Sequence, residues 1–434
     1  MTGLEVRIEP FGFDDQAIVR VVRAPDGLPA GGPAQLLDVS GYAGNPNIRV
    51  AGQELFERLR ANGEAVEALR RLIALPQDLS NPVYLDIDEP NAMTLPWEQL
   101  CVDNTFLSLS WSWQVARLSN PIRPTSKPYV TTPSIRLLAI LSALNRPAQA
   151  EWRQIKNSVE NGIEIGLDIN LLVTATETGV RTEVQGYIDA GNGHVTLLDP
   201  PSTAGDVRGF IQDHRPHLVH FYAHGSRRDG APVLTMAKTT DWDDPTRSHG
   251  SVNLKLEDIG RTATNAGAWL VVLNSCMSAA PENKRLDGED EVGSFAAELV
   301  ASGVPAAIGH RRAIESNDAN RLAKALYPEV FRLVNECVSV PGRRELEFAS
   351  VMHSVRELLR EAHADGDATA ADNWSIPVLY VRPTQLSIEV VGSEEEAEVA
   401  GAQLGQEDVV NETLEALEDL DLPPGLLEEL RGIV

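Results

Sequence analysis

HLVHFYAHG, from His217 to Gly225, and WLVVLNSC, from Trp269 to Cys276, are the two stretches that decide the fold of this 434-residue chain. Each is an apolar run long enough for one buried strand, and each delivers a reactive side chain at its carboxyl end. In an open α/β sheet, that end of the strands is the edge where ligands and catalytic groups gather. We therefore expect His224 and Cys276 to meet at such an edge, as in a thiol hydrolase.

Further apolar runs alternate with helical stretches along the middle of the chain. They are Ile135 to Leu144, Ile169 to Thr176, Val195 to Asp199, Val304 to Gly309 and Ile376 to Val381. The runs are continuous, and continuous apolar strands are covered on both faces, whereas half-exposed strands alternate. The sequence therefore predicts an α/β fold with a largely parallel sheet sandwiched by helices.

The first part of the chain has a different pattern. LEVRIEP and IVRVVRAPDG alternate like a hairpin or edge strands, Gln53 to Ala74 has helical spacing, and PVYLDIDEP indicates a short strand. We predict a small β/α accessory region over residues 1–125 and a catalytic domain over residues 126–384. Residues 385–434 are predicted to form an acidic linker and amphipathic tail.

The charge of the chain limits its partners. Its formal net charge is −26, and fourteen acidic residues against one arginine lie in 385–434. Such a charge repels phosphate backbones and anionic membranes, so we expect neither nucleic acid nor a membrane as a partner. The tail has two open interpretations, a solubilising segment or a docking helix for a regulatory protein.

The cysteine content favours a reducing compartment. The chain has an odd number of cysteines, and they are widely spaced with no CxxC pair: Cys101, Cys276 and Cys337. The amino terminus lacks a signal-peptide pattern, and no stretch reaches the roughly 18 apolar residues that span a bilayer. We expect a cytoplasmic protein that has neither a metal site nor another cofactor.

The cysteine and histidine form a chemically sensible pair. A thiol is nucleophilic as its thiolate, which a neighbouring base generates, and His224 is the matching general base for Cys276. Gly225 lets the backbone approach a substrate closely, and its amide, with that of Cys276, offers an oxyanion hole. Cys101 and Cys337 lack such a partner and are expected to be buried hydrophobes, and His217 and His220 to be core groups.

These motifs resemble the CHAT proteases, caspase-like cysteine peptidases related to separase. The similar segments are LPWEQL (95–100), HFYAHG (220–225), VVLNSCMSA (271–279), GEDEVGSFAAELVASGVPAAIG (288–309) and DNWSIPVLYV (372–381). The resemblance implies a caspase-like fold and a His224–Cys276 dyad that hydrolyses peptide bonds, with the Gly225 and Cys276 amides as the oxyanion hole. It also implies a protein substrate and a regulatory partner in a defence or cell-death pathway.

The resemblance further implies an acidic residue that selects a basic side chain before the scissile bond. RRAIESNDAN offers Asp318 for this role, with Glu315 second. A buried carboxylate binds an arginine in a bidentate geometry, which gives the preference a physical reason. The chain departs from the family here, because His310 or Arg311 stands where the loop usually has a tryptophan.

Other interpretations of the same residues remain open. The dyad residues can persist for packing in a catalytically silent protein-interaction scaffold, and the same fold can carry a thiol hydrolase or acyltransferase for small molecules. Arg227 and Arg228 beside His224 could select an acidic substrate residue instead of a basic one.

Overall fold

The structure is a computed structural model that describes most of the chain. It describes residues 3–12, 16–25, 35–38, 45–59, 63–74, 81–110, 113–121, 128–228, 231–244, 250–275, 294–312, 316–362, 366–367, 369, 371–393 and 395–397. Two predicted site residues, Cys276 and Glu315, lie outside these ranges, as do the tail residues from 398 onward.

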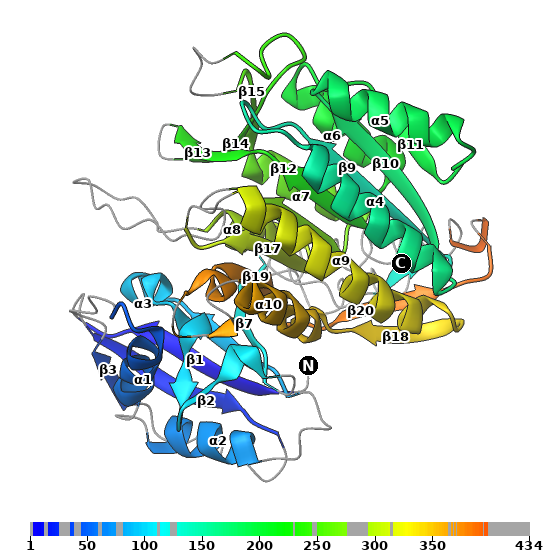
Figure 1. Ribbon diagram of the computed structural model, residues 1–434. Coiled ribbons are helices and arrows are strands. Elements are labelled where there is room, and N and C mark those ends of the chain that lie inside the picture. Colours follow the sequence, from blue (N-terminus) through cyan, green and yellow to red (C-terminus); the bar gives the residue numbers. More distant parts are fainter. Residues whose placement is uncertain are drawn as a thin grey trace, which may run out of the picture.

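One twelve-stranded sheet joins both halves of the chain (Figure 1). Its order is β11-β10-β9-β12-β16-β17-β19-β7-β4-β1-β2-β3. The strands are β1 (Leu4–Pro10), β2 (Gln16–Arg23), β3 (Gln35–Asp38), β4 (Val83–Ile87), β7 (Val115–Leu118), β9 (Ser134–Leu141), β10 (Asp168–Ala175), β11 (Val195–Leu197), β12 (Leu218–Tyr222), β16 (Leu270–Asn274), β17 (Ala306–His310) and β19 (Pro377–Val381). The strands from β11 to β17 are all parallel to one another, which confirms the predicted largely parallel sheet.

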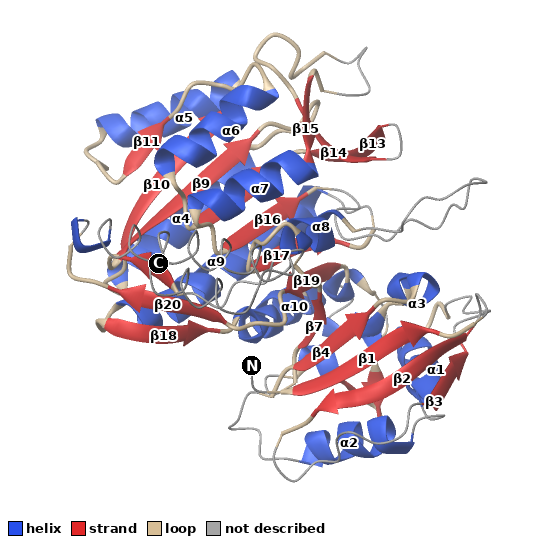
Figure 2. Cartoon of the chain, turned by 180° about the vertical axis from the view of Figure 1, so that it is seen from behind, coloured by secondary structure: helices blue, strands red, loops and turns tan. Residues whose placement is uncertain are grey.

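Helices cover both faces of this sheet (Figure 2). They are α1 (Ile48–Leu59), α2 (Gly63–Ala74), α3 (Pro90–Thr94), α4 (Gln149–Glu164), α5 (Thr178–Asp189), α6 (Ala204–His214), α7 (Leu256–Ala266), α8 (Phe295–Ala301), α9 (Ser316–Val338) and α10 (Met352–Glu361). Buried residues of α4, α5, α9 and α10 form one core, and those of α6, α7 and α8 form another. Leu137 belongs to the first core and Leu138 to the second, which explains why the strand is apolar at consecutive positions.

The N-terminal region has a core of its own but shares the sheet. Strands β1 to β4 pack with α1 and α2, and β4 continues the sheet through β7 to β19. The helical spacing from Gln53 to Ala74 corresponds to two helices instead of one, and the second begins at Gly63.

Three small sheets complete the described fold. They contain β13 (His224–Arg228), β14 (Ala231–Met236) and β15 (Val252–Lys255); β18 (Gly342–Leu346), β20 (Leu386–Val390) and β8 (Tyr129–Thr131); and β5 (Cys101–Val102) with β6 (Thr105–Phe106). The expected tail began at residue 385, but β20 pairs with β18 and β8 and buries Ile388. Residues 386–390 therefore belong to the folded part.

No helix among the residues described is long and apolar enough to cross a bilayer.

His217, just before β12, gives the stability of the fold a pH dependence. Its Nδ1 accepts the backbone N–H of Arg136 at 3.0 Å, and its Nε2 lies 3.1 Å from the Thr131 hydroxyl. Burial, helped by Arg136 and Arg215, lowers the pKa of His217 to about 3. The unfolded histidine titrates near 6.5, so between about pH 3 and 6.5 the unfolded chain binds one proton more than the folded chain.

We therefore expect the free energy of unfolding to fall as the pH drops below about 6.5, with His217 contributing up to ~1.4 kcal/mol per pH unit. Urea unfolding at pH 7 and pH 5, on the wild type and on His217→Gln, measures this contribution. The variant should show the shallower loss of stability, and equal losses in both proteins would refute the assignment.

Candidate active site

The strands that precede the predicted histidine and cysteine are neighbours in the sheet. β12 and β16 run parallel, with Tyr222 opposite Asn274. His224 lies two residues beyond Tyr222, and Cys276 lies two residues beyond Asn274. The register therefore brings both chain segments to the same edge of the sheet at the same height, although Cys276 itself lies outside the described residues.

His224 is the first residue of β13 and is half-buried. Its Nε2 lies 2.7 Å from the carbonyl oxygen of Leu144, in the segment that follows β9. A carbonyl oxygen can only accept, so Nε2 carries a hydrogen and donates it. In the neutral ring, Nδ1 is then the basic nitrogen, and the Leu144 contact fixes both the tautomer and the ring plane.

Gly225 follows in β13, opposite Leu234 of β14. Two pairs further along the same ladder, Arg227 lies opposite Pro232, and proline has no backbone N–H to donate. This favours the alternation in which Ser226, not Gly225, exchanges backbone hydrogen bonds with β14. The N–H of Gly225 then points away from β14, as an oxyanion donor requires.

A buried polar network lies beneath the end of β16. The Asn274 carboxamide contacts Glu151 at 2.7 Å, the Ala319 carbonyl at 2.9 Å and His310 at 3.0 Å. Glu151 Oε1 also lies 2.9 Å from His220 Nε2. His220 is thus a buried core group, as predicted, but it belongs to a network that reaches the end of β16.

Asp318 lies in the first turn of α9 and is 5% exposed. Its carboxylate is engaged within the chain, because Arg321 approaches it at 3.0 Å and the Asn373 side chain donates to its other oxygen. Glu315, the second predicted specificity residue, lies outside the described part of the chain. A substrate guanidinium that reaches Asp318 would have to share it with Arg321 or replace Arg321.

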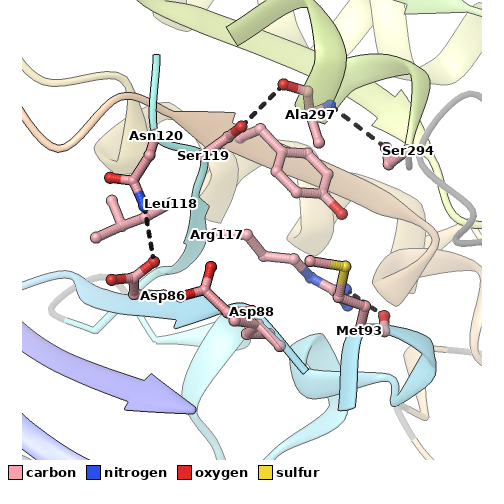
Figure 3. Close-up of a pocket in the computed structure, with 11 residues that line it drawn as sticks. Asp86, Asp88, Met93, Arg117, Leu118, Ser119, Asn120, Ser294 and Ala297 are labelled. Carbon is pink, nitrogen blue, oxygen red and sulfur yellow. Dashed lines mark hydrogen bonds between the residues drawn. The ribbon is translucent and has the colours of Figure 1, made fainter. Parts of the chain in front are cut away.

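A cavity of about 240 Å³ lies between the ends of the N-terminal strands and the first turn of α8 (Figure 3). Asp86 of β4, Asp88 just after β4 and Arg117 of β7 line it. Burial and the charge of Asp86 raise the pKa of Asp88. β19 runs antiparallel to β17, and β7 and β4 run parallel to β19, so β4 and β7 end at the edge opposite to His224.

Within the described ranges, no group of three or more histidine, cysteine or acidic side chains is placed to hold a metal ion. Burial raises the pKa of Cys101 and of Cys337 to about 11, which fits the prediction that these thiols are unreactive core groups.

The sequence did not reveal the groups that contact His224 and the end of β16. The Leu144 contact is made by a backbone carbonyl, which leaves no sequence signal. Asn274 stands within the quoted motif VVLNSC, so its position was visible, but its partners come from α4, β17 and α9. Only the packed fold brings those elements together.

One family model and several solved structures are similar to this chain. The CHAT domain profile matches residues 117–336, about half of the chain. Similar solved structures include the Saccharomyces cerevisiae separase in complex with securin, with 12% identity, a TM-score of 0.37, and coverage of 77% of this chain and 18% of separase. Another is the Arg-specific cysteine proteinase gingipain R, with 11% identity, a TM-score of 0.40, and coverage of 77% of this chain and 67% of gingipain. This chain thus spans under a fifth of the separase chain that it matches.

No curated protein matches the sequence. The match of the domain profile decides the assignment, and the chain belongs to the CHAT domain family.

Proposed function

We propose that this protein is a cysteine endopeptidase that uses a dyad of His224 and Cys276. The observation that carries the proposal is the register of β12 and β16, which brings the segments of both residues to one sheet edge. The contact between His224 Nε2 and Leu144 adds support, because it leaves Nδ1 as the basic nitrogen.

The proposed reaction follows acyl-transfer chemistry. His224 Nδ1 takes the proton of the Cys276 thiol, the thiolate attacks the scissile carbonyl, and the backbone amides of Gly225 and Cys276 stabilise the oxyanion that forms. His224 protonates the leaving amine from Nδ1, so the peptide bond breaks and a thioester remains. Water, deprotonated by the same nitrogen, then hydrolyses the thioester and regenerates the thiol.

The proposed substrate is a protein cut after a basic residue. Asp318 and Glu315 are the proposed acidic residues of the specificity pocket. The burial of Asp318 supports this role, since a carboxylate at 5% exposure interacts strongly with a guanidinium. Its contacts with Arg321 and Asn373 require an exchange of partners when a substrate binds.

We further propose that the enzyme works in the cytoplasm and that a protein partner activates it in a defence or cell-death pathway. The odd, widely spaced cysteines fit a reducing compartment, and Cys101 and Cys337 are free and buried. The acidic residues beyond 397 offer a docking segment for such a partner.

A mixed peptide library tests the proposal, with cleavage identified by mass spectrometry for the wild type beside Cys276→Ala, alone and with candidate partner proteins. We expect cuts after arginine or lysine that require Cys276, and we expect Cys276→Ala to retain its thermal stability. Cuts at other residues would keep the peptidase and reject Asp318 as the pocket acid. Silence under every condition would favour the protein-interaction scaffold instead.

A further inference from the structure

The polar network beneath β16 is unusual for its place in the core. Five side chains that are at most 2% exposed contribute to it: Glu151, His220, Asn274, His310 and Tyr327. Burying polar groups is costly unless each is bonded, and apolar side chains of similar size often stabilise a core equally well. The location of the network, at the last residue of the strand that leads to Cys276, therefore calls for a reason.

The contacts of Asn274 define its orientation without ambiguity. The Ala319 carbonyl can only accept, so the amide nitrogen Nδ2 must face it, together with Glu151 Oε1. The amide oxygen then faces His310, whose Nε2 donates to it at 3.0 Å. Burial lowers the pKa of His310 to about 3, despite the opposing charge of Asp318, so the ring is neutral at neutral pH and the contact with the Asn274 oxygen places its proton on Nε2.

Behind Glu151, the network continues to His220 and Tyr327. Glu151 Oε1 lies 2.9 Å from His220 Nε2, and the Tyr327 hydroxyl lies 2.8 Å from His220 Nδ1. Burial, with the charge of Glu151, raises the pKa of Tyr327, so the phenol keeps its proton. The network therefore ties β12 and β16, the two strands that lead to the dyad, to α4 and α9.

We infer that Asn274 is a positioning residue for Cys276. Its side chain makes three hydrogen bonds to three different elements, α4, β17 and α9, so the backbone leaves β16 in a fixed direction two residues before the nucleophile. Misplacing a reacting group by about 1 Å can cost ~10²-fold in rate. The inference rests on the proposed function, because it assigns Asn274 a role in the reaction of Cys276.

Asn274→Asp tests the inference with almost no change in shape. The substitution sets a carboxylate oxygen against Glu151 and the Ala319 carbonyl, where the amide donated. The titratable groups near the new carboxyl are Glu151, His310 and, through Glu151, His220, and Asp318 acts on His310. We expect kcat at pH 7.5 to fall ~10²-fold with KM within about twofold. Activity should recover partly at lower pH, as the acid regains a donor.

Three comparisons make this result decisive. Asn170→Asp, at an exposed asparagine that bonds Ser134, is the matched control and should leave kcat and its pH profile unchanged. If Asn274→Asp does not fold, Asn274→Ala, which removes all three side-chain contacts, is assayed in its place and should show the same fall in kcat. A folded variant with the kcat of the control, or a loss that follows only the unfolded fraction without recovery in acid, would overturn the inference.

A second readout separates this inference from the proposed function. The rate at which iodoacetamide alkylates Cys276 reports the position and ionisation of the thiol without any peptide bond. If the wild type shows no Cys276-dependent cleavage, the peptidase proposal fails. The alkylation rate of Asn274→Asp against Asn170→Asp then still tests the positioning, with an unchanged rate as the refuting result.

Discussion

Replacing His224 with glutamine is expected to slow Cys276-dependent cleavage by about 10²–10⁴-fold, the usual contribution of a general acid–base group. The glutamine amide can still donate to the Leu144 carbonyl, as Nε2 of the histidine does at 2.7 Å. It has no nitrogen that accepts a proton, so the leaving amine is no longer protonated. The variant should therefore keep the local structure and lose the chemistry.

Steady-state kinetics on a peptide from the library measure the effect, with thermal unfolding to verify the fold. His214→Gln, in the last turn of α6, is the matched control and should retain full activity. The alkylation of Cys276 gives independent support, because without the imidazole the thiol should need a higher pH to react. Cleavage by His224→Gln within about threefold of the wild-type rate would remove His224 from the dyad.

The central sheet was predictable because its signal is local. Runs such as WLVVLN are apolar at every position, and a strand covered on both faces requires that pattern whatever its neighbours are. The order of the strands was not predictable in the same way. β19 follows β17 in space but runs antiparallel to it, and from there β7 and β4 continue the sheet into the N-terminal region. The local sequence IPVLYV does not indicate whether this strand runs parallel or antiparallel to its neighbours.

The candidate site was also predictable only in part. His224 and Cys276 carry a motif signal, so the sequence named them as the dyad. The contacts around them depend on chain segments that are far apart in sequence, such as Glu151 with Asn274. Glu151 stands in an ordinary helical sequence, and only the packing of α4 on the sheet turns it into a buried partner. The acidic composition after residue 385 likewise predicted a tail, because the pairing of β20 with β18 and β8 depends on segments far away in the sequence.

Glu98→Gln is expected to cause one of the largest losses of stability in this chain. Glu98 and Arg117 form a bidentate pair at 2.9 and 2.8 Å, with side chains that are 0% and 3% exposed. Burial on its own would raise the pKa of the Glu98 carboxyl. The charge and hydrogen bonds of Arg117 outweigh burial, so the pKa is lowered. Removing this carboxylate leaves the guanidinium buried without its counterion, which costs about 3–5 kcal/mol.

The pair also explains why the loss should be felt across the molecule. Arg117 lies on β7, where the N-terminal strands join β19, and its guanidinium bonds the carbonyls of Met93 and Leu95 as well. Urea unfolding of Glu98→Gln measures the loss, with Glu183→Gln as the control. That variant breaks the exposed pair with Arg153 and should leave the midpoint unchanged. An equal midpoint for both variants would mean that the buried charge is neutralised by some other group, and that the junction of the two halves does not depend on this ion pair.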